Sequence, residues 1–254
     1  MTDENIPHPE QTPCTQCGML IPVNAKFCAL CGEKQLIEGT TAAPEENKWL
    51  LLKQAALFFA IDLVACCLAK FVDYFKPLHW LIFIDAIMAI NAIVFFALNW
   101  KENKKILVWR NFSLQKLAAY AGIAMTASIL VHYSVGWLNT TIFPKEQHSY
   151  FFYRSALYIW LFVVFLDAVC PAIFEELGYR GYLMQTLLKV ADREQVIYIS
   201  SFLFAIIHMS FISLFWLIPF ALFLGYVRIK EDTIWYGVFI HFCFNFTACL
   251  FELL

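Results

Sequence analysis

Charged residues are scarce in this chain of 254 residues. Asp, Glu, Lys and Arg together make up 15% of the sequence, whereas 61% is hydrophobic and 18% is aromatic. Soluble domains are nearer one quarter charged and one half apolar, so the composition excludes an ordinary soluble domain and indicates a membrane protein. The formal net charge of −2 leaves no basic surface field, and we therefore expect no nucleic acid among the partners.

An apolar run is missing from the amino-terminal segment, residues 1–47. This segment is polar and lacks the hydrophobic core that a signal peptide needs, so we expect no secretory signal. It holds four of the nine cysteines, in two CxxC pairs that are ten residues apart and are each followed by glycine. The other five cysteines are scattered through apolar segments, where they are expected to pack as small hydrophobic side chains.

The two CxxC pairs are typical of a zinc ribbon, because each turn brings two thiolates to the same ion and two turns complete the tetrahedron that Zn²⁺ prefers. So short a segment cannot build a hydrophobic core, and we expect structural zinc to supply its folding energy. Two disulfides or a redox pair are the alternatives, and a cytosolic location would exclude the disulfides. The predicted ligands are Cys14, Cys17, Cys28 and Cys31.

Changes in composition predict four parts of the chain. They are a tail at residues 1–13, the zinc ribbon at 14–34, a flexible acidic linker at 35–47 and a transmembrane domain at 48–254. The ribbon resembles the short zinc ribbons at the N-termini of many prokaryotic membrane proteins, which indicates a bacterial inner membrane. It could bind a protein partner or merely cap the chain.

From Trp49 onward we predict an all-α polytopic membrane domain that crosses the lipid bilayer in about seven helices. Each helix is near the ~20 apolar residues that a crossing needs. The fourth is too long for one straight crossing, and we expect Pro171 to kink it. The predicted spans are 49–71, 78–100, 114–137, 153–172 with a helical continuation to 188, 195–212, 213–229 and 232–252.

Basic residues predict the orientation of these spans. The loop at 101–110 carries Lys101, Lys104, Lys105 and Arg110 and is the densest basic loop. Basic loops remain on the cytoplasmic side. Alternation then places the ribbon and the segments at 189–193 and 228–230 on the cytoplasmic side as well, and the loops at 72–77 and 139–152 outside.

Ionisable side chains recur at one depth in the later spans. Counted from the nearest cytoplasmic basic residue, Glu175, His208 and His241 lie 11–15 residues deep, which is roughly 16–22 Å at ~1.5 Å per residue. A carboxylate and two imidazoles at one level of the membrane have the geometry of a site. Other ionisable groups in the spans are interpreted as interhelical hydrogen bonders, namely Asp62, Asp85, Asp167 and His132.

The stretch "PAIFEELGYRGYL", residues 171–183, carries three of the charges. Glu176 and Arg180 are four residues apart with the acid first, so they share a helix face and can form an ion pair. Glu175 points about 100° away from that face and is the candidate general base, because a desolvated carboxylate without a full counter-charge binds protons more strongly. Gly178 and Gly181 leave room for a neighbouring helix or for substrate backbone.

Two further segments show the same spacing of four residues. In "FLFAIIHMS" we expect the ring of Phe204 to stack beside the imidazole of His208. In "FIHFCFNF" the imidazole of His241 and the amide of Asn245 point the same way, and two adjacent donors could stabilise an oxyanion.

Together the three segments resemble the motifs of the CPBP family, the CAAX proteases and bacteriocin-processing enzymes related to eukaryotic CAAX prenyl endopeptidases. The resemblance covers residues 153–254, and it departs from the family pattern at Tyr179, where phenylalanine is usual. The ribbon and the first three spans lie outside it. The resemblance implies hydrolysis of a peptide bond in a cavity within the membrane, with a hydrophobic or membrane-associated peptide as substrate.

Carried over by position, the resemblance also implies roles for the site residues. Glu175 would act with His208 to activate the attacking water. His241 and Asn245 would stabilise the tetrahedral oxyanion. The glutamate–arginine pair would hold the helix and orient Glu175.

Signatures of other intramembrane proteases are absent from the sequence. It contains no HExxH for the zinc type, no GxSxG for the serine type and no GxGD for the aspartyl type. One glutamate with two histidines suits Zn²⁺ chemically, but the two-histidine turn of HExxH is missing. A catalytic metal is therefore left open and is not favoured.

Two other functions fit parts of the sequence. A non-catalytic membrane scaffold or a bacteriocin-immunity protein could keep the same fold and act by binding, with the ribbon as its docking module. An ion or proton transporter would explain the buried ionisable residues, but no inverted repeat supports it.

Overall fold

The computed structural model describes residues 11–23, 25, 27–33, 47–109, 112–141 and 157–253. The chain divides into two compact units, Met1–Glu46 and Asn47–Leu254. Most of the predicted tail, nearly all of the predicted linker, Arg110 of the basic loop and residues 142–156 lie outside the described residues.

The first unit contains a small hairpin. Strands β1 (Gln11–Pro13) and β2 (Leu20–Pro22) pair antiparallel, with Thr12 opposite Ile21. Gly18 and Gly32, which follow the two CxxC pairs, have φ angles of 71° and 76°. This left-handed region is open to glycine at little cost, so both glycines are required by the turns that carry the cysteines.

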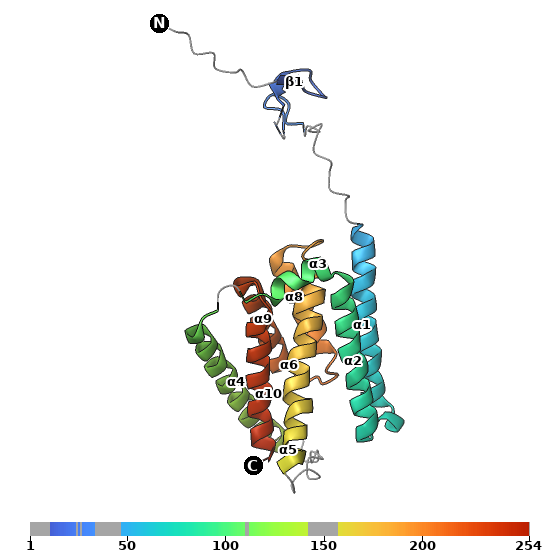
Figure 1. Cartoon of the computed structure of the whole chain (residues 1–254), viewed down its shortest axis with the longest axis vertical. Coiled ribbons are helices and arrows are strands. Elements are labelled where there is room, and N and C mark those ends of the chain that lie inside the picture. The colour runs from blue at the N-terminus through green and yellow to red at the C-terminus, as the bar shows by residue number, and fades with distance from the viewer. Residues whose placement is uncertain are drawn as a thin grey trace. The chain divides into compact units, whose positions relative to one another are not determined.

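The second unit is a helical bundle (Figure 1). The amide oxygen of Asn47 caps the first helix by accepting from the backbone of Trp49 and Leu50. Among the described residues, three helices are long and apolar enough to cross a membrane, and their outward faces are rich in exposed apolar side chains. They are α1 (Lys48–Phe71), α2 (Leu78–Leu98) and α4 (Leu114–Thr141).

A basic connection follows α2. It consists of α3 (Trp100–Asn103) and a short 3-10 turn at Lys104–Leu107. Backbone carbonyls of this connection accept hydrogen bonds from the start of α10 (Trp235–Leu253): Thr233 Oγ1 donates to Ile106 at 3.0 Å, and Trp235 Nε1 donates to Leu107 at 2.7 Å. α10 in turn packs along α4, where Ser128 Oγ donates to the carbonyl of Phe244 at 2.8 Å.

The predicted long fourth helix is present and is irregular within its length. α5 (Leu157–Val164), α6 (Cys170–Glu175) and α7 (Met184–Leu187) are joined by π-helical stretches at Phe165–Val169 and Glu176–Leu183. The first stretch ends two residues before Pro171, which has no N–H to continue an α-helical ladder. π-helical turns are rare and often mark functional sites, and the second stretch contains the Glu176–Arg180 motif.

The predicted count of seven spans is not confirmed. α8 (Arg193–Ile206) has 14 residues, about 21 Å, against a hydrocarbon core of ~30 Å. α9 (Leu214–Glu231) has 18 residues. The predicted span at 195–212 is wrong at its end, because the helix stops at Ile206 and a non-helical segment at 207–213 follows it.

The end of α8 has a local cause in the sequence. His208 Nδ1 lies 2.9 Å from the carbonyl oxygen of Phe204. The side chain thereby satisfies a carbonyl that the next helical turn would otherwise use. Met209 then adopts φ 50°, which directs the chain out of the helix.

Close approach of helices accounts for Gly178. A Cβ atom at this position would lie 2.8 Å from Phe58 of α1 and 3.3 Å from Ala92 of α2. The expected room for a neighbouring helix is therefore confirmed. We predict that Gly178→Ala lowers the free energy of unfolding in detergent by about 1–3 kcal/mol, as overpacking does elsewhere.

The matched control for this substitution is Gly122→Ala in α4. A Cβ there meets nothing within 4 Å, so relief of the glycine penalty should leave stability unchanged or raised by about 0.5–1 kcal/mol. Equal effects of the two substitutions in thermal unfolding would contradict the packing explanation.

Candidate active site

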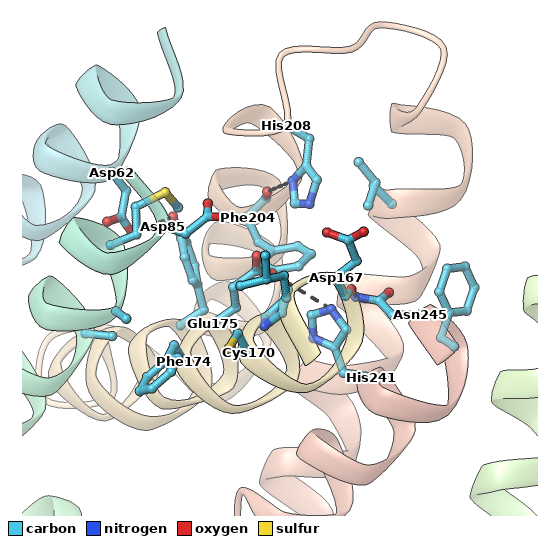
Figure 2. A pocket seen from close by; sticks show the side chains of 18 of the residues that line it. Asp62, Asp85, Asp167, Cys170, Phe174, Glu175, Phe204, His208, His241 and Asn245 are labelled. Carbon is cyan, nitrogen blue, oxygen red and sulfur yellow. Dashed lines mark hydrogen bonds and ion pairs between the residues drawn. The ribbon is translucent and has the colours of Figure 1, made fainter. Parts of the chain in front are cut away.

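A cavity of about 440 Å³ lies inside the helical unit (Figure 2). Its wall is formed by α1, α2, the long helix, α8, α9, α10 and the segment after α8. All four predicted catalytic residues line this cavity, from three separate parts of the chain: Glu175, His208, His241 and Asn245. Glu175, His208 and His241, which the sequence placed at a similar depth in the membrane, therefore do line the same cavity.

His208 stands at the end of α8, and its ring nitrogens are distinguishable. Because a carbonyl oxygen can only accept, the contact with Phe204 requires that Nδ1 carry the proton. In the neutral ring Nε2 is then free to accept a proton. The side chain is exposed within the cavity wall, so Nε2 can act on a water or substrate atom there.

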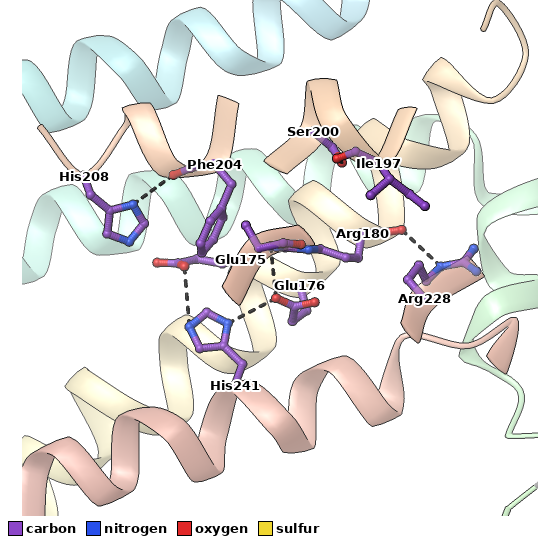
Figure 3. A network of polar contacts seen from close by, with 10 residues as sticks. Glu175, Glu176, Arg180, Ile197, Ser200, Phe204, His208, Arg228 and His241 are labelled. Atoms are coloured by element: carbon purple, nitrogen blue, oxygen red, sulfur yellow. Dashed lines mark hydrogen bonds and ion pairs between the residues drawn. The ribbon is translucent and has the colours of Figure 1, made fainter. Parts of the chain in front are cut away.

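His241 lies between the two neighbouring glutamates (Figure 3). Its Nδ1 is 3.1 Å from Oε1 of Glu176, and its Nε2 is 3.8 Å from Oε2 of Glu175. A carboxylate accepts, so Nδ1–H donates to Glu176 and Nε2 is directed at Glu175. The sequence paired Glu176 with Arg180 alone, and the contact with His241 was missed because it joins helices 65 residues apart.

The predicted ion pair between Glu176 and Arg180 is present, at 3.1 Å between Oε1 and Nη1. The two side chains are 0% and 1% exposed. Arg180 also donates from Nη2 to the carbonyl of Ala221 at 3.3 Å, and its guanidinium lies 4.3 Å from the ring centre of Phe204. This network fixes the helix turn that carries Glu175.

Phe204 was expected to contact one histidine, His208, but its ring contacts both histidines of the cavity and Arg180. Its ring centre is 5.0 Å from that of His208, with the planes tilted by 58°, so the expected contact between the two rings is present. The ring also meets His241 edge to face at 6.0 Å. Phe204 therefore separates the arginine from the cavity and supports both imidazoles.

Asn245 lines the cavity one helical turn after His241. Its Nδ2 donates to the backbone carbonyl of Asp167 at 3.1 Å. An amide nitrogen carries two hydrogens, so this bond orients the group and leaves one N–H to donate. The predicted donor pair for an oxyanion thus consists of that N–H and Nε2 of His241 when it is protonated.

The four residues that were interpreted as interhelical hydrogen bonders have different surroundings in the structure. For Asp62 the interpretation is confirmed, because Asn91 of α2 donates to it at 2.8 Å. Asp85 and Asp167 line the cavity instead, and no described residue donates to either side chain. His132 stacks on Phe251 of α10 with ring centres 4.5 Å apart. A signal for the two aspartates was available, since carboxylates at membrane depth are functional by default.

In the first unit the four cysteines converge as the spacing predicted. Their sulfurs lie within 4.8 Å of one another, at 3.6 Å for Cys14–Cys31 and 3.7 Å for Cys17–Cys28. A tetrahedral metal site with ~2.3 Å metal–sulfur bonds has sulfurs about 3.8 Å apart, whereas a disulfide measures ~2.05 Å. None of the four cysteines forms a disulfide, and the set could hold a metal ion.

Backbone amides of the first CxxC turn favour the thiolate form of Cys14. The N–H groups of Cys17 and Gln16 lower the pKa of Cys14 to about 6. The thiolate is the form that binds metal.

Comparison with known families addresses the second unit. Residues 155–247 match the model of the family described as type II CAAX prenyl endopeptidase, Rce1-like. This segment is similar to the Rce1-like family. The resemblance seen in the three motifs is thereby confirmed, and Glu175, His208, His241 and Asn245 all fall within the match. No curated protein matches the chain, and no solved structure matches it.

The Rce1-like segment does not build the cavity alone. It supplies the long helix, α8, α9 and most of α10, whereas α1, α2, α4 and the cysteine hairpin precede it. The similarity of this segment to an endopeptidase family, together with the apolar helices, indicates an integral membrane protein.

Proposed function

We propose that the protein is an intramembrane endopeptidase that uses Glu175 and His208 to activate a water molecule for attack on a peptide bond. The observation that carries the proposal is the shared cavity, in which a carboxylate and two oriented imidazoles face one space. The family match supports the reaction class. The substrate is a hydrophobic or membrane-associated peptide, because the cavity lies among lipid-facing helices.

The roles follow from the hydrogen bonds of each group. Glu175 Oε2 accepts no hydrogen bond from the described residues, and the side chain is 21% exposed in the cavity wall, so the carboxylate is available to take a proton from water. His208 Nε2 is the second proton acceptor. His241, held on Glu176, and Asn245, held on a backbone carbonyl, would donate to the oxyanion of the tetrahedral intermediate.

A catalytic metal is not part of the proposal. Glu175, His208 and His241 could supply one carboxylate and two imidazole ligands, a chemically suitable set for Zn²⁺. Their ligand atoms do not converge as the four sulfurs do, since the cysteines are the one group of metal-ligating side chains found together among the described residues.

Hydrolysis can be tested with the purified full-length protein in detergent and a hydrophobic peptide in H₂¹⁸O. We expect two fragments, with ¹⁸O in the new carboxyl terminus of one of them. His208→Ala should lower kcat/KM by roughly 10²- to 10³-fold, as loss of a general base does. Cleavage that is equally fast in the His208→Ala preparation would identify a contaminating protease and contradict the proposal.

We further propose that the cysteine hairpin is a structural zinc ribbon on the cytoplasmic side of a bacterial inner membrane. The sulfur separations support zinc, as does the finding that none of the four cysteines forms a disulfide. Purified protein should contain one zinc ion per chain, and Cys28→Ser should lose it, because three ligands bind far less tightly. Thermal unfolding of the helical unit should be unchanged by that substitution. Retention of metal by the variant would contradict the assignment.

The scaffold function remains the second candidate. Five large apolar side chains of the first unit are exposed and would suit a protein partner, namely Met19, Leu20, Val23, Phe27 and Leu30. A biological effect that survives loss of peptide cleavage but is abolished by removing residues 1–46 would favour binding over catalysis.

A further inference from the structure

Arg228 is a buried arginine of α9 that the proposed chemistry does not use. Its side chain is 2% exposed and donates two hydrogen bonds to the long helix. Nε donates to the backbone carbonyl of Arg180 at 3.2 Å, and Nη2 donates to Oε1 of Gln185 at 3.1 Å (Figure 3). Its acidic neighbour Asp232 is 3.6 Å away and 72% exposed, so that ion pair contributes little. The guanidinium is therefore held mainly by its hydrogen bonds to the long helix.

The carbonyl of Arg180 lies where the backbone bonding of the long helix changes. The second π-helical stretch, Glu176–Leu183, ends with the N–H of Met184 donating to the carbonyl of Tyr179, five residues back, and α7 follows. A return from π-helical to α-helical bonding passes over one carbonyl, and a buried carbonyl needs a donor. The carbonyl after that of Tyr179 belongs to Arg180, and Arg228 Nε supplies a donor to it.

A second side-chain donor lies at the other end of α6, the segment that ends at Glu175. In an α-helix the donor to the carbonyl of Asp167 would be the N–H of residue 171, which is proline and has none. Asn245 Nδ2 donates to this carbonyl at 3.1 Å. The turn that carries the glutamates therefore lies between two backbone carbonyls that accept from side chains of other helices, Asn245 of α10 and Arg228 of α9.

α9 contacts Arg180 at its backbone and at its side chain. Arg228 donates to the backbone carbonyl, and the carbonyl of Ala221, seven residues earlier on α9, accepts from Nη2 of Arg180 at 3.3 Å. The same guanidinium pairs with Oε1 of Glu176, the oxygen that also lies against His241 Nδ1, both at 3.1 Å. A shift of the backbone at Arg180 would therefore move the carboxylate that orients His241.

We propose that Arg228 is a positioning residue for the hydrolytic groups. Its Nε–H fixes the backbone of Arg180, and the side chain of Arg180 fixes the carboxylate of Glu176. That carboxylate orients His241 toward Glu175. The proposal rests on the proposed endopeptidase function. Arg228 is not among the described residues that line the cavity, so it acts through the groups that it holds and not on the substrate.

The test uses three replacements of Arg228 that separate its donor from its charge. Glutamine places an amide nitrogen where arginine has Nε, so it keeps a donor there and loses the charge. Lysine keeps the charge and has a methylene group at that atom, and methionine has neither donor nor charge. Lys230→Gln and Lys230→Met change an exposed residue of the same helix and are the matched controls.

Cleavage of a hydrophobic peptide by full-length protein in detergent gives kcat and KM. Arg228→Met and Arg228→Lys should lower kcat by on the order of 10- to 100-fold, because a small misplacement of reacting groups is enough for such a loss. KM should stay nearly unchanged. Arg228→Gln and both Lys230 variants should keep kcat close to that of wild type. Replacing a buried charge by an apolar side chain is often neutral for stability, and thermal unfolding checks that each variant is folded.

Two outcomes would overturn the proposal. Full kcat in folded Arg228→Met would show that the donor is not needed. Equal losses in Arg228→Met and Arg228→Gln, with full activity in Arg228→Lys, would assign the effect to the charge instead of the donor.

A second measurement does not depend on cleavage. In protein with ¹⁵N-labelled histidine, NMR reports the proton on His241 Nδ1, which resonates downfield when it is bonded to a carboxylate and is assigned by its loss in His241→Gln. The signal should be the same in wild type and Arg228→Gln and should shift or disappear in Arg228→Met. An unchanged signal in Arg228→Met would overturn the positioning role. The expected signals in a protein that cleaves no peptide would leave the positioning of His241 standing and contradict the protease, whereas cleavage with equal kcat in all variants would do the reverse.

Discussion

Replacing Glu175 by glutamine should lower kcat/KM for peptide cleavage by on the order of 10³- to 10⁴-fold, because glutamine keeps the shape of the side chain and cannot take a proton from water. The expected change lies in kcat, since the amide still fits the space between His241 and the cavity. Cleavage of a fluorogenic hydrophobic peptide by purified protein in detergent measures both constants.

The matched control for Glu175→Gln is Glu102→Gln. Glu102 is exposed and pairs with Lys105 far from the cavity lining, so its replacement should leave kcat/KM within about twofold. The thermal unfolding of both variants should match that of wild type. Full activity in well-folded Glu175→Gln would exclude the carboxylate as the base.

Glu176→Ala should have the largest effect on stability, a loss of about 3–5 kcal/mol in the free energy of unfolding. The substitution leaves the guanidinium of Arg180, 1% exposed, without its counter-charge. It also removes the acceptor of His241 Nδ1. Thermal or denaturant unfolding in detergent, followed by circular dichroism, measures the loss.

Two comparisons isolate the buried pair. Lys105→Met breaks an exposed pair whose side chains are 56% and 52% accessible, and it should cost less than about 1 kcal/mol. The double replacement Glu176→Leu with Arg180→Met should recover much of the lost stability, because no buried charge remains. A Glu176→Ala protein as stable as Lys105→Met would contradict the electrostatic role of the pair.

The sequence was most informative where the information is local. The pairing of Glu176 with Arg180 follows from helical spacing, and the cysteine cluster follows from two tight turns. The similar membrane depth of His208 and His241 was predicted by counting residues along the apolar segments. In each case the relevant contact, or the relevant depth, lies within a few turns of one segment.

Contacts between distant segments could not be predicted in the same way. The bond from His241 to Glu176 depends on the axial register of α10 against the long helix, which no spacing within either segment determines. Whether Asp85 faces lipid or the cavity depends on the rotation of α2. The end of α8 at Ile206 depends on a side chain that replaces the next backbone bond, in a stretch apolar enough to continue as helix.

Two parts of the chain meet in this cavity, one inside and one outside the segment that matches the family model. The groups proposed to break the peptide bond all lie in residues 155–247, whereas Asp62 and Asp85 stand on α1 and α2, before that segment. Exchange of α1 and α2 for helices with other cavity-facing side chains would therefore alter which peptides are cut while the hydrolytic groups stay the same. The choice of substrate would then depend on helices that lie outside the segment with the hydrolytic groups.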